Sequence, residues 1–123
     1  MNPNQNMTPK EKELFQKIRT LLTPDLIPEK FRDNKINSPF YGHCYHASLA
    51  LYKLLGGKEA GYRIKCGIDS DNIKHYWIEV NDRIIDPTIE QYTDLDRALP
   101  YSNLSKCDYR PSKSTKILIE KLA

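Results

Sequence analysis

A β-hairpin predicted over residues 75–86 constrains the fold of this chain more than any other stretch. Residues 75–80 (HYWIEV) combine aromatic and β-branched side chains, as strands do, and residues 83–86 (RIID) form a second short strand that ends at a proline. Asn81 and Asp82 lie between them, and these residue types favour a tight two-residue turn. The sequence therefore predicts two antiparallel strands joined directly by a tight turn.

The length of this turn decides which side chains share a face of the hairpin. A two-residue turn places Trp77 opposite Asp86, because paired positions are counted outward from the turn. His75 lies two residues from Trp77 and faces the same side, which brings His75 and Asp86 onto one diagonal with Cα atoms roughly 7–8 Å apart. An imidazole and a carboxylate can meet across that distance. A turn one residue longer would put them on opposite faces.

A second feature is a cysteine at the predicted start of a helix. After Gly42, small and apolar side chains recur at three- and four-residue spacings up to residue 55, and glycines at 56 and 57 supply a flexible stop. Cys44 falls in the first turn. There the unpaired backbone N–H groups and the positive end of the helix dipole favour a thiolate over a thiol. Nucleophilic cysteines are commonly activated in this way.

The other periodic segments indicate an α+β fold. Residues 8–11 (TPKE) combine an N-cap threonine, a proline at the first helical position and a glutamate that can close a capping box, so they open a first helix. Residues 62–68 alternate as a strand does, and residues 110–112 (RPS) open a last helix. We expect residues 8–123 to form a single domain in which the cysteine-bearing helix packs on a small antiparallel sheet and helices at both termini cover it.

Three segments carry weaker signals. Residues 1–7 are polar and rich in asparagine, so we expect a disordered tail. Residues 25–41 are punctuated by prolines and are predicted to form a long loop, with a short helical turn, that walls a cleft in front of Cys44. Residues 88–109 are polar and tyrosine-bearing, and their pattern assigns no element.

Composition excludes several classes of function. The 123 residues include 39% hydrophobic ones, enough for one modest core. Nineteen Lys and Arg against sixteen Asp and Glu give a net charge of +3 with both signs interspersed, whereas nucleic-acid binding needs a concentrated basic patch. No apolar run approaches the ~20 residues of a membrane span. Three cysteines without paired spacing, and a polar start without a leader-like apolar stretch, predict a reduced, cytoplasmic protein.

Cys44, His75 and Asp86 together are the parts of an activated-thiol acyl-transfer site. The thiolate would attack a carbonyl, the imidazole would carry protons, and the carboxylate would fix the imidazole's tautomer. The backbone N–H of Cys44 can stabilise an oxyanion, and we expect a second donor from Tyr41 or Asn37 in the preceding loop. Two further residues are assigned to the cleft: His43 as a lining residue, and Trp77 as a wall that keeps water from His75.

The order Cys44, His75, Asp86, with a helix on the cysteine and paired strands carrying the other two, resembles the papain-like superfamily, in particular its small transglutaminase-like and NlpC/P60-like members. The resemblance implies a papain-like core, with Cys44 as nucleophile, His75 as general base and acid, and Asp86 as orienting residue. Papain-type peptidases also carry an oxyanion glutamine upstream of the cysteine, and the loop before Cys44 contains no glutamine. Several short motifs are similar to those of a group of short phage and bacterial proteins: residues 42–45 (GHCY), 54–57 (LLGG), 75–77 (HYW), 86–88 (DPT) and 110–113 (RPSK).

Two other interpretations stay open. The chain can be a catalytically silent phage or bacterial binding protein that uses the same scaffold to target a host protein. It can also be a metal protein, since His43 and His46 are three apart and, with Cys44 and either His75 or Cys66, would form a ligand set. Zinc needs about four ligands with recognisable spacing, and no paired motif supplies them. We therefore expect no metal or cofactor. For an acyl-transfer site, we expect the substrate to be a protein or a small amide or thioester.

The remaining cysteines have simpler predicted roles. Cys66 lies in the middle of a predicted strand, where a free cysteine acts as a small apolar filler. Cys107 lies in a polar stretch and is expected to have no partner.

Overall fold

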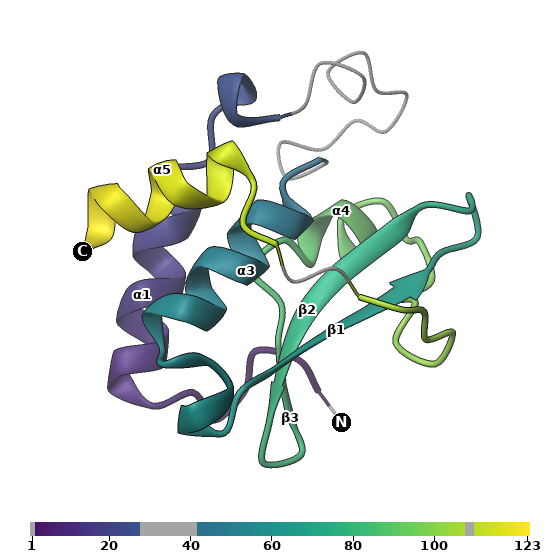
Figure 1. Ribbon diagram of the computed structural model, residues 1–123. Coiled ribbons are helices and arrows are strands. Elements are labelled where there is room, and N and C mark those ends of the chain that lie inside the picture. The colour runs from purple at the N-terminus through teal and green to yellow at the C-terminus, as the bar shows by residue number, and fades with distance from the viewer. Residues whose placement is uncertain (1, 28–41, 108–109) are drawn as a thin grey trace.

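The computed structural model describes residues 2–27, 42–107 and 110–123, and within them the chain is a mixture of helices and one antiparallel sheet (Figure 1). Tyr41, Asn37 and most of the predicted loop over 25–41 lie outside the described residues. The helices and strands, in chain order, are α1 (Pro9–Thr20), η1 (Pro24–Leu26), α3 (Cys44–Leu54), η2 (Gly57–Ala60), β1 (Arg63–Ile68), β2 (Lys74–Val80), β3 (Arg83–Ile85), α4 (Glu90–Thr93) and α5 (Lys113–Leu122).

The three strands form an antiparallel sheet in the order β1-β2-β3, and the hairpin register is the one predicted from the sequence. Val80 pairs with Arg83 and Ile78 with Ile85. Both turn residues, Asn81 and Asp82, have positive φ angles of 47° and 61°, as a tight two-residue turn of type I′ requires. The turn length, on which the placement of His75 and Asp86 depended, is therefore confirmed.

Helix α3 runs along β2 and forms the centre of the core. The thiol of Cys44 lies 3.8 Å from the Lys74 carbonyl, and the Ser48 hydroxyl donates to the Tyr76 carbonyl at 3.1 Å. Four helical residues rise about 6 Å and two strand residues about 6.6 Å, so these two contacts hold the helix and the strand in a fixed alignment. The buried face of α3 packs on the sheet side chains of the same face; the core cluster includes Ala47, Leu51, Ile64, Tyr76, Ile78, Val80, Ile85 and Leu118.

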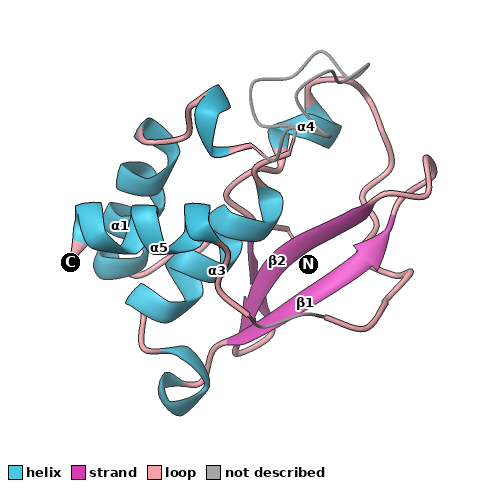
Figure 2. Ribbon diagram, turned by 45° about the horizontal axis from the view of Figure 1, so that its top comes forward, coloured by secondary structure: helices cyan, strands magenta, loops and turns pink. Residues whose placement is uncertain are grey.

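Helices α1 and α5 lie on the same side of the sheet as α3 and complete this layer (Figure 2). Both begin as the sequence predicts. Thr8 caps α1 in a capping box with Glu11, and Ser112 caps α5 in a capping box with Thr115. The terminal helices are thereby confirmed, and the chain has an α+β architecture.

The opposite face of the sheet is covered by the segment that had no predicted structure. After β3 the chain forms the short helix α4 and then returns along the free edge of β1, where Gly67 forms a bridge with Leu104. Tyr92 packs against His75 and Tyr101 against Trp77, with ring centroids 4.7 Å apart in each case. The side chains of His75 and Trp77 are therefore enclosed between the sheet and this segment.

Residues 2–7, which belong to the segment predicted to be a disordered tail, include two asparagines that contact the end of the hairpin. The backbone N–H of Asn4 donates to the Ile84 carbonyl at 2.8 Å, and the Asn4 side chain bonds the backbone of Asp86. The reason is tertiary: the end of β3 offers backbone groups that a short polar segment can satisfy. Within the described segments, no helix combines the length and the apolar character needed to cross a membrane.

Candidate active site

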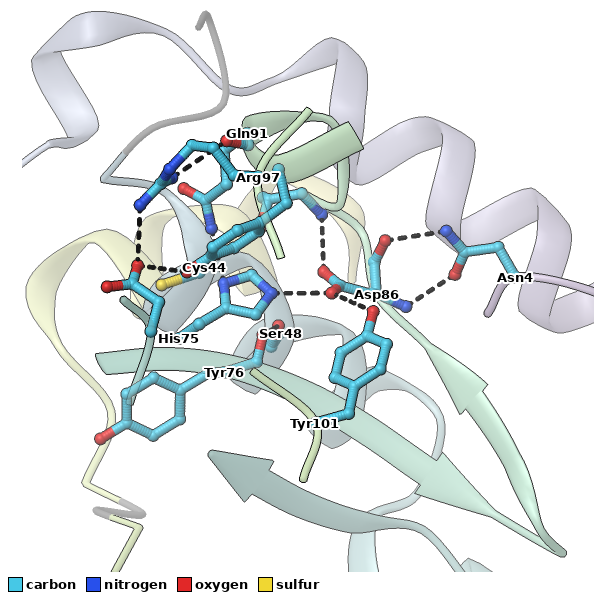
Figure 3. Close-up of polar contacts among 12 residues, drawn as sticks. Asn4, Cys44, Ser48, His75, Tyr76, Asp86, Gln91, Arg97 and Tyr101 are labelled. Carbon is cyan, nitrogen blue, oxygen red and sulfur yellow. Dashed lines mark hydrogen bonds and ion pairs between the residues drawn. The ribbon is translucent and has the colours of Figure 1, made fainter. Parts of the chain in front are cut away.

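His75 and Asp86 form a buried pair on the face of the hairpin predicted from the register. His75 Nε2 lies 2.7 Å from Asp86 Oδ2, and both side chains have no exposed surface (Figure 3). Burial by itself lowers the pKa of His75, because it disfavours the charged imidazolium. The Asp86 carboxylate outweighs burial and, with a smaller contribution from the Cys44 thiol, raises the pKa of His75 well above its usual value.

Two further groups hold the Asp86 carboxylate in place. The Tyr101 hydroxyl donates to Oδ2, the oxygen that also contacts His75, at 2.7 Å. The backbone N–H of Thr88 donates to Oδ1 at 3.2 Å. The carboxylate is therefore fixed in one orientation, and so is the imidazole bonded to it.

Cys44 is the first residue of α3, and its side chain points toward His75 (Figure 3). The first intrahelical hydrogen bond runs from Ala47 N–H to the His43 carbonyl, so the N–H groups of the residues before Ala47 have no partner within the helix. The N-cap residue, His43, makes no capping hydrogen bond with its side chain. In contrast to the capped starts of α1 and α5, the start of α3 can thus offer backbone donors to a negatively charged group.

Gln91, which the sequence did not single out, lies at the other nitrogen of the imidazole. Its side-chain Nε2 is 2.5 Å from His75 Nδ1, and the residue is buried on α4. In this orientation the amide N–H donates to an unprotonated Nδ1; when Nδ1 carries a proton, a turned amide presents its oxygen instead. Gln91 therefore lies beside both Cys44 and His75 (Figure 3), in a stretch without hydrophobic periodicity that could have drawn attention to it.

Cys44 and Gln91 line one pocket of about 970 Å³. One wall contains Asp69, which accepts hydrogen bonds from Tyr92 at 2.8 Å and from Arg97 at 3.1 Å. Burial alone would raise the pKa of Asp69, but backbone and side-chain donors lower it, so the wall keeps a paired carboxylate and guanidinium. The pocket lining also includes apolar and aromatic residues: Leu26, Ile27, Tyr45, Tyr76 and Ile117.

The predicted cleft residues have different places. Trp77 is buried and its ring is stacked on His75, with centroids 6.0 Å apart. His43 is buried, and the pocket is lined by His46 instead of His43. The reason is local: the Nδ1 atom of His43 turns toward His46 Nε2 at 2.7 Å. His46 thus lines the pocket and also holds the His43 side chain away from it.

In the described segments, no group of three or more His, Cys, Asp or Glu side chains is arranged around a common point, and His43 and His46 contact each other instead. Burial, the largest effect in both cases, lowers the pKa of His43 to about 4 and that of His46 to about 3. Both are neutral near pH 7 and share one hydrogen bond.

The other two cysteines lie near each other at β1. Cys66 is fully buried, as predicted, and burial followed by a hydrogen bond with Cys107 raises its pKa to about 12. Cys107 was expected to have no partner. Instead its thiol lies 3.7 Å from the Ile64 carbonyl, because the segment that covers the edge of β1 brings it there.

Comparisons of the chain with protein-family models, with curated proteins and with solved structures found no match.

Proposed function

We propose that this protein is a cysteine-dependent acyl-transfer enzyme with a papain-like, transglutaminase-like core, which hydrolyses an amide or thioester or moves the acyl group to an amine. One observation carries the proposal: a cysteine at an uncapped helix start points into a pocket and toward a fully buried histidine–carboxylate pair. Burying two ionisable groups costs free energy, and a buried histidine of shifted pKa that pairs with a carboxylate beside a nucleophile is typical of active sites.

In the first half-reaction, Cys44 Sγ attacks the carbonyl carbon of the substrate. The attacking sulfur is a thiolate whose proton already resides on His75 Nδ1, in keeping with the raised pKa of His75, and Asp86 stabilises this imidazolium through Nε2. The tetrahedral intermediate then collapses, the bond to the leaving group breaks, and His75 returns the proton to the leaving amine or thiol. The product of this step is an acyl group bound to Cys44 as a thioester.

In the second half-reaction, water or an amine attacks the thioester. His75 removes a proton from the attacking group, and the Cys44 thiolate leaves, which restores the thiolate and imidazolium pair. Attack by water completes hydrolysis or deamidation, and attack by an amine completes transfer. Both outcomes use the same residues, so the nature of the acceptor that the pocket admits decides between them.

The oxyanion of the intermediate needs donors in place before the reaction. The backbone N–H of Cys44 supplies one. Gln91 supports a second, because its amide lies within reach of His75 Nδ1 and lines the pocket next to the thiol. Tyr41 and Asn37, the candidates from the sequence, lie outside the described residues, whereas Gln91 would act from a position downstream of the cysteine.

The test is the formation of a covalent acyl-enzyme. We expect an activated acyl thioester to add one acyl group to the intact protein, measured by mass spectrometry, and peptide mapping to place it on Cys44. Cys44→Ser and His75→Ala should abolish the adduct, whereas Cys107→Ser, which alters a partly exposed thiol outside the pocket, should keep it. If the wild-type protein forms no adduct and Cys44→Ala retains the biological effect, the protein acts by binding a partner on the same scaffold.

A further inference from the structure

The amino-terminal segment reaches the carboxylate end of the candidate site. The side-chain amide of Asn4 makes two hydrogen bonds to the backbone of one residue: its Oδ1 accepts from Asp86 N–H at 2.6 Å, and its Nδ2 donates to the Asp86 carbonyl at 2.9 Å (Figure 3). The backbone N–H of Asn4 donates in addition to the Ile84 carbonyl at 2.8 Å. Asn4 thus binds Asp86 as a neighbouring strand would.

Asp86 needs such support because it lies just past the sheet. The paired positions of β2 and β3 end at Ile78 and Ile85, so the next residue is not part of that register. Its carboxylate is held by His75, Tyr101 and Thr88. The hydrogen bonds to its own backbone N–H and carbonyl come from Asn4. They fix the position of the Asp86 backbone, from which the carboxylate extends toward His75.

Asparagine suits this position for two reasons. Its amide carries a donor and an acceptor in one plane, which aspartate or serine cannot reproduce. Asn4 also has a φ of 63°, in the left-handed region that asparagine tolerates better than most residues. The segment is tied down again nearby, because Arg83 donates to the Asn6 carbonyl at 3.0 Å.

We propose that Asn4 is a positioning residue of the Cys44–His75–Asp86 site: its amide holds the Asp86 backbone so that the carboxylate meets the imidazole. The inference rests on the proposed function for its effect on catalysis, while its effect on the histidine–carboxylate pair is independent of any reaction. The amino-terminal segment is then a working part of the site, although it lies 82 residues from Asp86 in the chain.

The test uses Asn4→Gly in the 123-residue chain, which keeps the left-handed backbone accessible and removes the side chain with its amide. Asn2→Ala, a change at an exposed neighbour in the same segment, is the control. The first readout is the NMR signal of the His75 Nε2 proton and the titration of the imidazole. The second is the rate of Cys44 acylation by an activated thioester, and thermal unfolding is recorded for each variant.

We expect Asn4→Gly to shift the His75 signal, to lower the pKa of His75 and to slow acylation by about tenfold or more, as small misplacements of catalytic groups do. Asn4→Asp, which keeps the acceptor but loses the donor, should change the same readouts. Asn2→Ala should change none. If Asn4→Gly lowers thermal stability but leaves the His75 signal unchanged, Asn4 only anchors the amino-terminal segment and the proposal is wrong. The proposal is also wrong if Asn4→Gly changes none of the readouts. If wild-type protein forms no acyl-enzyme while the His75 signal still depends on Asn4, the proposed function fails and the positioning role stands.

Discussion

His75 Nε2 and Asp86 Oδ2 lie 2.7 Å apart with no exposed surface on either side chain. An unpaired charge at such depth would be strongly disfavoured, so the imidazolium of His75 depends on the carboxylate beside it. Burial and the carboxylate act on the imidazole in opposite directions, and the carboxylate prevails. The protonation state of His75 is therefore a direct measure of the pair.

Asp86→Asn should reverse the shift in the pKa of His75. Without the carboxylate, burial dominates and the pKa should fall below about 6.5, the unperturbed value for histidine. NMR titration of the imidazole measures this change directly. Asp82→Asn removes an exposed carboxylate from the turn of the same hairpin and should leave the titration unchanged. A wild-type pKa retained in Asp86→Asn would mean that the carboxylate is not what holds the proton.

Gln91→Ala should separate two reactions of the same thiol. Acylation by a thioester passes through an oxyanion, and removing one oxyanion donor typically costs about 10²–10³ in rate. Alkylation by iodoacetamide forms no oxyanion, so its rate should change much less. The measurement is the ratio of the two second-order rates in the variant and in wild type. An equal loss in both reactions would instead assign Gln91 to the orientation of His75 alone.

Glu11 should stabilise the protein against acid. Burial alone would raise its pKa, but Arg83, Tyr62 and the Thr8 backbone bind the carboxylate and lower the pKa from 4.5 to about 2. A lowered carboxyl pKa gives stability that is present above pH 4.5 and is lost as the pH falls through about 2. Glu11→Gln should therefore cost about 2–3 kcal/mol near pH 7.

Urea unfolding of Glu11→Gln, followed from neutral to acid pH, measures this contribution. Glu13→Gln is the matched control on the same helix, because its side chain is 63% exposed and its pair with Lys17 is a surface one. A loss of stability as large in the control would refute the assigned role of the buried carboxylate.

The buried pair of His43 and His46 should destabilise the fold at moderately acid pH. The unfolded chain binds protons at about pH 6.5, whereas in the folded protein burial lowers the two pKa values to about 4 and about 3. Stability should therefore fall as the pH drops from 6.5 toward about 3, with each unit of pKa difference worth about 1.4 kcal/mol. His46→Gln should flatten the upper part of this slope, above the range in which Glu11 titrates, in urea unfolding curves. If the dependence of the unfolding free energy on pH is the same in His46→Gln and in wild type, groups other than this histidine cause the acid sensitivity.

The parts of the site that sequence reasoning found are those encoded by neighbouring residues. Asn81 and Asp82 set the turn and thereby the diagonal of His75 and Asp86, and the spacing after Gly42 set the helix start at Cys44. These signals depend on turn chemistry and periodicity, which act over a few residues.

The parts that sequence reasoning missed reach the site through tertiary contacts. Gln91 and Tyr101 lie in a stretch without periodicity, and Asn4 lies in a polar segment whose composition indicates disorder. Each is ordered by a partner that the local sequence does not reveal: the imidazole for Gln91, the Asp86 carboxylate for Tyr101 and the end of β3 for Asn4. The backbone groups of an unpaired strand end and a buried carboxylate both require hydrogen-bond partners. Only the three-dimensional fold shows which residues supply them.

The contact between β1 and the segment that carries Tyr101 gives a last prediction. A Cβ atom at Gly67 would lie 2.2 Å from the Pro100 carbonyl oxygen and 3.2 Å from Trp77, so Gly67→Ala must push this segment away from the sheet. We expect a loss of about 1–3 kcal/mol in urea unfolding, as for other overpacked sites. Because Tyr101 follows Pro100 directly, its hydrogen bond to Asp86 should break as well, and acylation of Cys44 should slow at least as much as in Tyr101→Phe. Gly61→Ala, where no atom lies within 4 Å of the new Cβ but φ is 92°, should lower stability without slowing acylation. A Gly67→Ala protein that reacts at the wild-type rate would show that the position of Tyr101 does not matter to the site.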